Sequence, residues 1–305
     1  MLGIGEIIRV NRKTVGYSQE ELCYGICSVS SLSKIENGEQ VPTRGTFEAL
    51  MQRMGMSAGV YPSFLNDADK EAYELQHDFN EMYAQGNYDK AEEILNKLSA
   101  IKGLDKVYDQ DILMCRVLIE QRRGLNAADA VKELEKIANF FIKDFSKDFS
   151  VEKIRMRALT KTEINLLNAL AAAYSRADDD KMAIKIWYEL SIYIESKVYD
   201  REGFAVVYTK LLHNLARAVG LSGDDEEAVR LCDKGIRDCI RYNRYTYFDN
   251  LLYNKGYGLM NLGREEEAHQ CIREAYYIRS ALGKTHGGRL EAIKKFADEK
   301  GIKLL

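Results

Sequence analysis

A six-residue pattern recurs along most of the chain, running from a turn-forming residue to an alanine. It is clearest at Gly86–Ala91, Gly223–Ala228 and Gly263–Ala268. A version without the glycine stands at 178–183, and Ala130 marks a fifth copy. The glycine favours a turn after one helix, and the small alanine allows the next helix to pack closely against it. The pattern therefore predicts repeated helix pairs and an all-α fold.

The composition agrees with a helical protein and bounds its function. Leu, Ala, Glu and Lys are plentiful, only two of the 305 residues are proline, and the formal net charge is −3. No apolar run reaches the roughly 18 residues of a membrane span, and residues 1–20 have no secretory apolar core. The six cysteines form no CxxC pair and only four histidines occur, which argues against a metal site. We expect a cytoplasmic protein without a cofactor.

The first sixty residues contain short helices with clear start and stop signals. Gly16 ends the first helix, and Ser18 with Glu21 forms a capping box for the second. Ser28 can cap a third helix over 29–36, and Thr43 can cap a fourth. Two short helices joined by a tight turn inside such a bundle follow the helix-turn-helix plan.

Residues 1–65 resemble the lambda-repressor-like (Xre) DNA-binding domain. The resemblance rests on Ser18-Gln19-Glu20-Glu21-Leu22, followed at the right interval by Ile35-Glu36-Asn37-Gly38. It implies that the third helix enters the major groove of double-stranded DNA and that Arg12 pairs with Glu36. The predicted DNA-binding residues on and around that helix are Gln19, Val29, Ser30, Ser33, Lys34 and Asn37.

The charge of this N-terminal region limits how it can bind DNA. Residues 1–58 contain six basic and six acidic side chains. A neutral domain gains little from counterion release, so a monomer is expected to bind weakly. We therefore expect a homodimer that reads two half-sites.

The five alanines that mark the helix pairs lie 39, 53, 45 and 40 residues apart. The turns resemble those of tetratricopeptide repeats, whose usual period is about 34 residues, so these repeats are longer and degenerate. We predict a right-handed superhelix of about five helix pairs over residues 66–288, followed by a capping helix in residues 289–305. The boundaries between about 100 and 160 are the least defined.

In its overall plan the chain resembles the RRNPP superfamily of peptide-sensing quorum regulators from Gram-positive bacteria, and within it the PlcR-type regulators. The resemblance implies a receptor for a short signalling peptide and a homodimer whose DNA-binding domains respond to that peptide. It implies no enzymatic activity, and no catalytic motif occurs in the sequence. The sequence leaves open whether the protein activates or represses, and which operator and peptide it binds.

The first helix of each pair lines the concave side of such a superhelix, where asparagine amides can bind a peptide backbone. Counting back from the alanines gives the candidate peptide-binding residues Asn165, Asn168, Lys210, His213, Asn214, Arg217, Asn250, Tyr253, Asn254 and Tyr257. These side chains have an alternative role, which is to link neighbouring repeats. The repeats themselves have an alternative ligand, a protein partner of a transcriptional repressor. Cys232 and Cys239 lie on one helical face, which favours core packing over a redox sensor.

Overall fold

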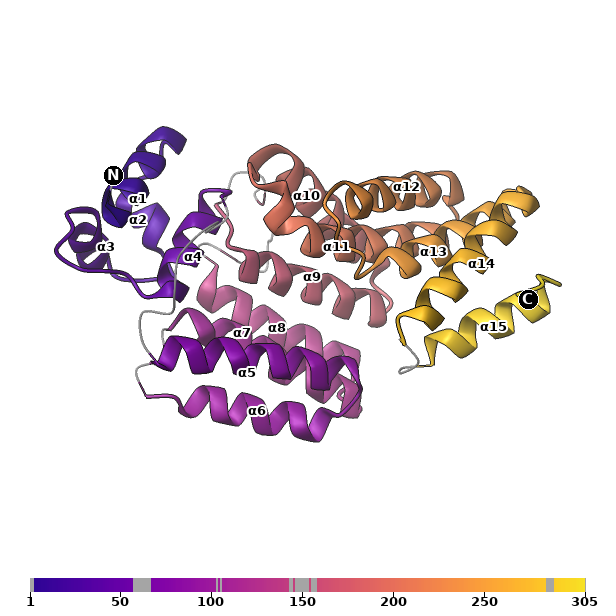
Figure 1. Ribbon diagram of the computed structural model, residues 1–305, viewed down its shortest axis with the longest axis horizontal. Helices are drawn as coiled ribbons and strands as arrows, with labels where there is room; N and C mark the ends of the chain where they lie inside the picture. Colours follow the sequence, from indigo (N-terminus) through magenta and orange to yellow (C-terminus); the bar gives the residue numbers. More distant parts are fainter. Residues whose placement is uncertain are drawn as a thin grey trace.

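The structure is a computed structural model that describes residues 3–56, 67–102, 104, 106–142, 145, 154, 158–283 and 288–304. Within these residues the chain is all-helical, as predicted, and contains no β-strand (Figure 1). A small bundle lies at the N-terminal end, and the other helices follow one another in a curved stack toward the C-terminus.

The N-terminal bundle forms where the capping residues predict it. In the capping box, Ser18 Oγ accepts from the Glu21 amide at 3.1 Å, and the Ser18 amide donates to the Glu21 carboxylate at 2.8 Å. Ser28 and Thr43 cap the third and fourth helices through their side chains. Gly16 ends the first helix in the left-handed conformation, with φ of 82°. The four helices are α1 (Ile4–Val15), α2 (Gln19–Cys23), α3 (Val29–Glu36) and α4 (Arg44–Arg53).

Within the described residues, the repeat region consists of five antiparallel helix pairs. The first helix of each pair is α5 (Asp67–Ala84), α7 (Val107–Arg123), α9 (Lys161–Arg176), α11 (Arg201–Leu221) or α13 (Phe248–Asn261). The second is α6 (Tyr88–Ala100), α8 (Ala127–Phe141), α10 (Asp180–Lys197), α12 (Asp225–Arg241) or α14 (Glu265–Ala281). Neighbouring pairs share one continuous apolar core that extends from α5 to the start of α13.

The alanine of each predicted turn lies in the first turn of the second helix and is buried. Ala91, Ala130, Ala183 and Ala268 are fully buried, and Ala228 is 3% exposed. The helix pairs predicted from the alanines are therefore confirmed, including the second pair, α7 and α8. Part of the long interval after α8 lies outside the described residues.

The last described helix, α15 (Arg289–Glu299), packs against the fifth pair. Its Phe296 ring lies 5.8 Å from the Tyr253 ring and 5.5 Å from the Tyr257 ring of α13, measured between centroids. The C-terminal helix thus packs against two aromatic residues of the last repeat. The domain boundary predicted near residue 65 lies outside the described residues.

Candidate functional site

The helix α3 presents one face to the core of the bundle and the other to solvent. Leu32 and Ile35 are buried in the core. The helix α3 lies at one edge of the molecule, away from the C-terminal repeats (Figure 1). The helix carries the predicted base-reading residues Val29, Ser30, Ser33 and Lys34, of which Ser33 is half-buried and the others are exposed. The predicted phosphate-contacting residue Asn37 is also exposed, at the end of the same helix.

The ion pair between Arg12 and Glu36 is confirmed and ties α1 to α3. The guanidinium binds the carboxylate through two bonds, from Nε at 2.6 Å and from the terminal nitrogen at 2.8 Å. Burial alone raises the pKa of Glu36, but hydrogen bonds from Arg12 and Gln19 outweigh it and lower the pKa. Gln19, predicted to contact phosphate, donates to this carboxylate at 2.8 Å. Its side chain therefore helps to hold α2 and α3 together.

On the inner side of the repeats, amides of successive first helices bind one another. Asn168 is 1% exposed, and its side-chain oxygen accepts from Trp187 at 2.8 Å and from the Asn214 amide at 3.1 Å. The Asn254 amide contacts Nδ1 and the carbonyl oxygen of His213 at 3.0 and 3.1 Å. These amides link neighbouring repeats, which is the alternative role considered above. Asn214 and Asn254 are half-buried.

His213 is buried beside two arginines and an ion pair. Burial, together with Arg289 and Arg217, lowers its pKa to about 3, so the ring is neutral near pH 7. Arg279 of α14 binds Asp249 of α13 at 2.5 Å, and the two side chains are 11% and 1% exposed. Near pH 7 the charges around His213 therefore come from the arginines and Asp249, and His213 itself contributes none.

Arginines of several helices gather near the C-terminal ends of the first helices. The pKa of Arg176 on α9 is lowered by desolvation and by repulsion from Arg122 on α7 and Arg217 on α11. The pKa of Arg289 on α15 is lowered by desolvation and by repulsion from Arg279 and Arg217. Within the described part of the chain, no carboxylate pairs with Arg122, Arg176, Arg217 or Arg289. The inner side thus has a cationic end that is not neutralised there.

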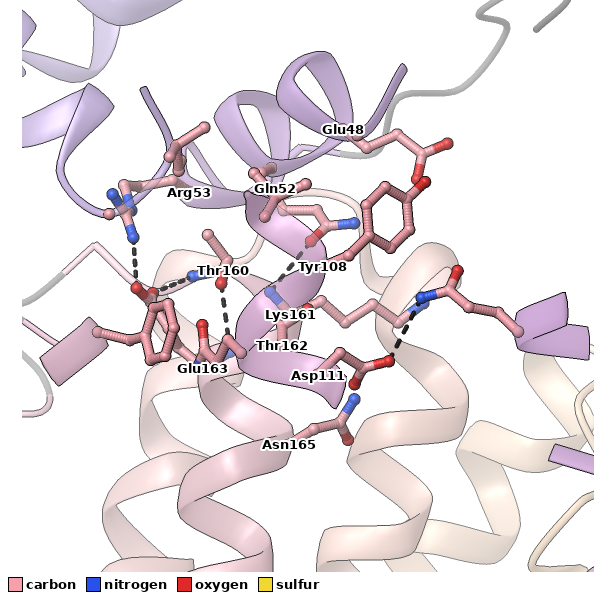
Figure 2. A pocket seen from close by; sticks show the side chains of 18 of the residues that line it. Glu48, Gln52, Arg53, Tyr108, Asp111, Thr160, Lys161, Thr162, Glu163 and Asn165 are labelled. Carbon is pink, nitrogen blue, oxygen red and sulfur yellow. Dashed lines mark hydrogen bonds and ion pairs between the residues drawn. The ribbon is translucent and has the colours of Figure 1, made fainter. Parts of the chain in front are cut away.

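A cavity of about 370 Å³ lies between the bundle and the repeats. Its walls come from α4 on one side and from α5, α6, α7 and α9 on the other. In Figure 2, Glu48 and Gln52 of α4 project from above, while Asp111 of α7 and Asn165 of α9 approach each other below. Gln76 donates to the Asp111 carboxylate at 3.3 Å, and burial raises the pKa of Asp111. The predicted residue Asn165 therefore lies in a polar cavity that touches both regions.

The bundle is held on the repeats beside this cavity by a buried ion pair and backbone hydrogen bonds. The Arg53 guanidinium of α4 binds the Glu163 carboxylate in the first turn of α9, and each side chain is at most 4% exposed. Gln52 accepts from the Lys161 amide at 3.1 Å. The Gly55 carbonyl oxygen accepts from the amides of Tyr199 and Asp200 at 2.8 and 3.0 Å.

Gly55 itself is required at this contact. Its φ is 74°, a left-handed conformation that disfavours other residues, and an added Cβ would overlap the Lys197 carbonyl oxygen. The close approach of the two backbones therefore fixes the position of the bundle against α10.

Sequence reasoning did not identify Asp111, Arg122, Arg176 or Arg289. Asp111 and Arg122 lie on α7, in the repeat whose boundaries were least defined. Arg289 is contributed by α15, which the sequence predicted only as a cap. The sequence shows that α7 begins with acidic residues and ends with basic ones, but it does not show where those ends lie relative to α9 and α11.

Comparisons with known proteins agree with this architecture. Residues 4–60 match the model of a family described as helix-turn-helix domain. The PlcR structure from Bacillus thuringiensis, in complex with the peptide PapR7 and DNA, superimposes with a TM-score of 0.63 at 19% identity. It covers 95% of this chain and 98% of that one. The N-terminal part of the chain is a helix-turn-helix domain.

Two further structures share the whole-chain fold. ComR from S. thermophilus, in complex with DNA and its signalling peptide ComS, gives a TM-score of 0.54 at 17% identity, covering 98% and 100% of the two chains. The Streptococcus dysgalactiae SHP pheromone receptor Rgg2 gives 0.50 at 17% identity, with the same coverage. No curated protein sequence matches the chain. The fold is thus a helix-turn-helix domain followed by tetratricopeptide-like repeats, as the sequence predicted.

None of the described helices is both long and apolar enough to span a membrane. In the same ranges, no group of three or more His, Cys, Asp or Glu side chains is placed to hold a metal ion.

Proposed function

We propose that the protein is a cytoplasmic transcription regulator that binds operator DNA through α3 as a homodimer, and that a short signalling peptide in its repeat domain controls this binding. The observation that carries the proposal is the exposed polar face of a capped α3 in a helix-turn-helix domain, joined to repeats in a fold shared along nearly the whole chain with PlcR and ComR. Those two proteins were each determined with DNA and a peptide.

For DNA binding, the geometry of α3 supplies the readout. Its first turn carries Val29 and Ser30, which can contact a thymine methyl and a base edge, and Lys34 follows one turn later. The balanced charge of residues 1–58 gives little phosphate attraction to one domain, so we propose a symmetric dimer on a palindromic site.

For peptide binding, α9 and α11 supply the half-buried residues Asn165 and Asn214, and the ends of α7, α9 and α11 supply arginines that have no carboxylate partner among the described residues. Amides offer a donor and an acceptor to an extended backbone, and guanidinium groups bind carboxylates. The predicted set from Asn165 to Tyr257 remains a proposal, with Tyr253 and Tyr257 already packed against Phe296.

Helix α9 can couple the two activities. Its first turn holds Glu163, which binds Arg53 of the DNA-binding domain, while Asn165 and Asn168 lie on the next turns. A ligand that shifts α9 therefore acts directly on the contact that positions the helix-turn-helix domain. Such coupling is reciprocal, so DNA must change peptide affinity by the same factor.

Selection of operator sequences from random DNA, followed by gel-shift titration, tests the proposal. Replacing Ser30 and Lys34 together with Ala should weaken specific binding at least tenfold, since each base contact contributes about 1–3 kcal/mol. Lys136→Ala, which removes an exposed lysine from α8, is the matched control and should leave affinity unchanged. Equal affinity of the double variant and the wild type would show that α3 is not the reading helix.

A second candidate is a repressor whose repeats bind a protein partner. It is favoured by the packing of Phe296 onto Tyr253 and Tyr257, because the protein's own C-terminal helix then covers the inner side of the last repeat. Purification from the native host with mass spectrometry distinguishes the two, since one predicts a bound peptide and the other a stoichiometric protein.

A further inference from the structure

We propose that the cavity between the bundle and the repeats binds the free N-terminus of the peptide, and that the peptide runs from there along α7 and α9 toward the arginines. This inference rests on the proposed function and adds the polarity and length of the ligand. It places one end of the ligand in contact with both the DNA-binding domain and the repeats.

The cavity has an acceptor for an ammonium group. Asp111 lines it, receives one hydrogen bond from Gln76, and forms no ion pair with any described residue. Lys210 lies close enough to attract the carboxylate but not to bind it directly. The remaining carboxylates in the wall are occupied, since Glu163 binds Arg53 and Glu48 binds Arg44 at 2.7 Å. An α-ammonium group would supply the cation that Asp111 lacks.

The cavity also has a donor without an acceptor. Gln110 is 5% exposed and lines the same space, and its side-chain nitrogen has no hydrogen-bond partner among the described residues. A buried donor left unpaired is costly, so this position favours a ligand with a carbonyl oxygen. An ammonium group and a carbonyl oxygen occur together in the first residue of a peptide.

The opposite end of the same helices is suited to a carboxylate. Gln121 of α7 accepts from Arg176 of α9 at 3.2 Å, and Arg122 lies close enough to repel Arg176. Asp111 and Asn165 line the cavity at the other ends of these two helices. The helices α7 and α9 therefore run side by side in the same direction. The end of this helix pair near the bundle carries Asp111, and the far end carries Arg122 and Arg176.

The distance between the two ends predicts the length of the ligand. Asp111 and Arg122 are separated by eleven residues of helix, as are Asn165 and Arg176, and a rise of about 1.5 Å per residue gives about 16 Å. An extended chain covers about 3.3–3.6 Å per residue, so a peptide of about five to six residues spans the distance.

Affinity selection from random hexapeptides tests the polarity. Equal amounts of free-amine and N-acetylated hexapeptides are incubated with the full-length protein, and the bound fraction is identified by mass spectrometry. We expect the wild type to enrich free-amine peptides at least tenfold over acetylated ones, because acetylation removes a charge-assisted hydrogen bond. Asp111→Asn should bring the ratio close to one. Asp109→Asn, at an exposed position on the same helix, should leave it unchanged.

The possible outcomes separate the two levels of the proposal. Enrichment of peptides regardless of acetylation would overturn the assignment of the N-terminus while leaving peptide binding intact. No enrichment of any hexapeptide would overturn the proposed function together with this inference. C-terminal amides in the same wild-type selection give a second readout that needs no variant. Their equal retention would show that the arginines do not bind the carboxylate.

Discussion

Replacing Glu163 with Gln should loosen the DNA-binding domain from the repeats. The side chains of Arg53 and Glu163 are 3% and 4% exposed, so neither is solvated by water. Gln keeps an oxygen that can cap α9, as Glu163 does for the Thr160 amide at 2.7 Å, so the helix itself should remain intact. The substitution therefore removes the charge of the ion pair without removing the cap.

The size of the effect follows from the burial of Arg53. Breaking a buried ion pair by removing one partner costs about 3–5 kcal/mol. Arg53 retains the carbonyl oxygens of Leu22 and Tyr24 as acceptors, so we expect the lower end, about 3 kcal/mol. A loss of that size changes the docking equilibrium about hundredfold.

Hydrogen exchange measures docking directly, because the amides of Tyr199 and Asp200 donate to the Gly55 carbonyl oxygen across the interface. In Glu163→Gln the protection of these two amides against exchange should fall about hundredfold. The fall cannot exceed the protection that docking provides in the wild type. Glu267→Gln is the matched control, since Glu267 holds the corresponding position in the first turn of α14 and its partner Arg264 is exposed. Unchanged protection of both amides in Glu163→Gln would refute the role of the ion pair.

Three further predictions concern the dimer, the inner side of the repeats and pH. Light scattering at micromolar concentration should show a dimer, and a monomer that remains monomeric on DNA would contradict the argument from charge. Asn214→Ala and Asn254→Ala should each weaken a selected peptide about tenfold or more by calorimetry while circular dichroism shows an intact fold, because a peptide group left unpaired costs about 1–3 kcal/mol. The lowered pKa of Glu36 stabilises the folded bundle above the ordinary carboxyl value of 4.5, and this stabilisation should be lost as the pH falls through the lowered pKa. Denaturation of Glu36→Gln should show a smaller dependence on pH in that range.

The helices and their pairing were predictable from the sequence because their signals are local. A capping box needs only Ser18 and Glu21, three residues apart, and each repeat turn needs only a glycine and an alanine. The partnership of Arg12 with Glu36 came from the family resemblance, since no local rule joins residues on different helices. The core packing of Cys232 and Cys239 followed from helical spacing, and both are fully buried.

The contacts between regions were not predictable, because they join residues far apart in the chain. Arg53 and Glu163 are separated by 110 positions, and nothing around either residue indicates the other. The inner amides show a different limit. Their positions followed from repeat spacing, yet spacing does not determine whether Asn214 faces a ligand or Asn168. The packing of α9 against α11 decides that the Asn214 amide contacts Asn168.

The arrangement of α9 explains why a peptide in the groove would affect a DNA-binding domain at one end of the molecule. Asn168 is fixed on α9 by Trp187 and Asn214, so the helix is anchored in the repeat core at its middle. Its first turn, by contrast, borders the cavity and holds Arg53 through Glu163. A ligand filling the cavity must contact this first turn and α4 at the same time. Because packed helices move as rigid units, even a small displacement there changes the geometry of the ion pair. The domain is therefore positioned by the part of the groove that our proposal assigns to the peptide's N-terminus.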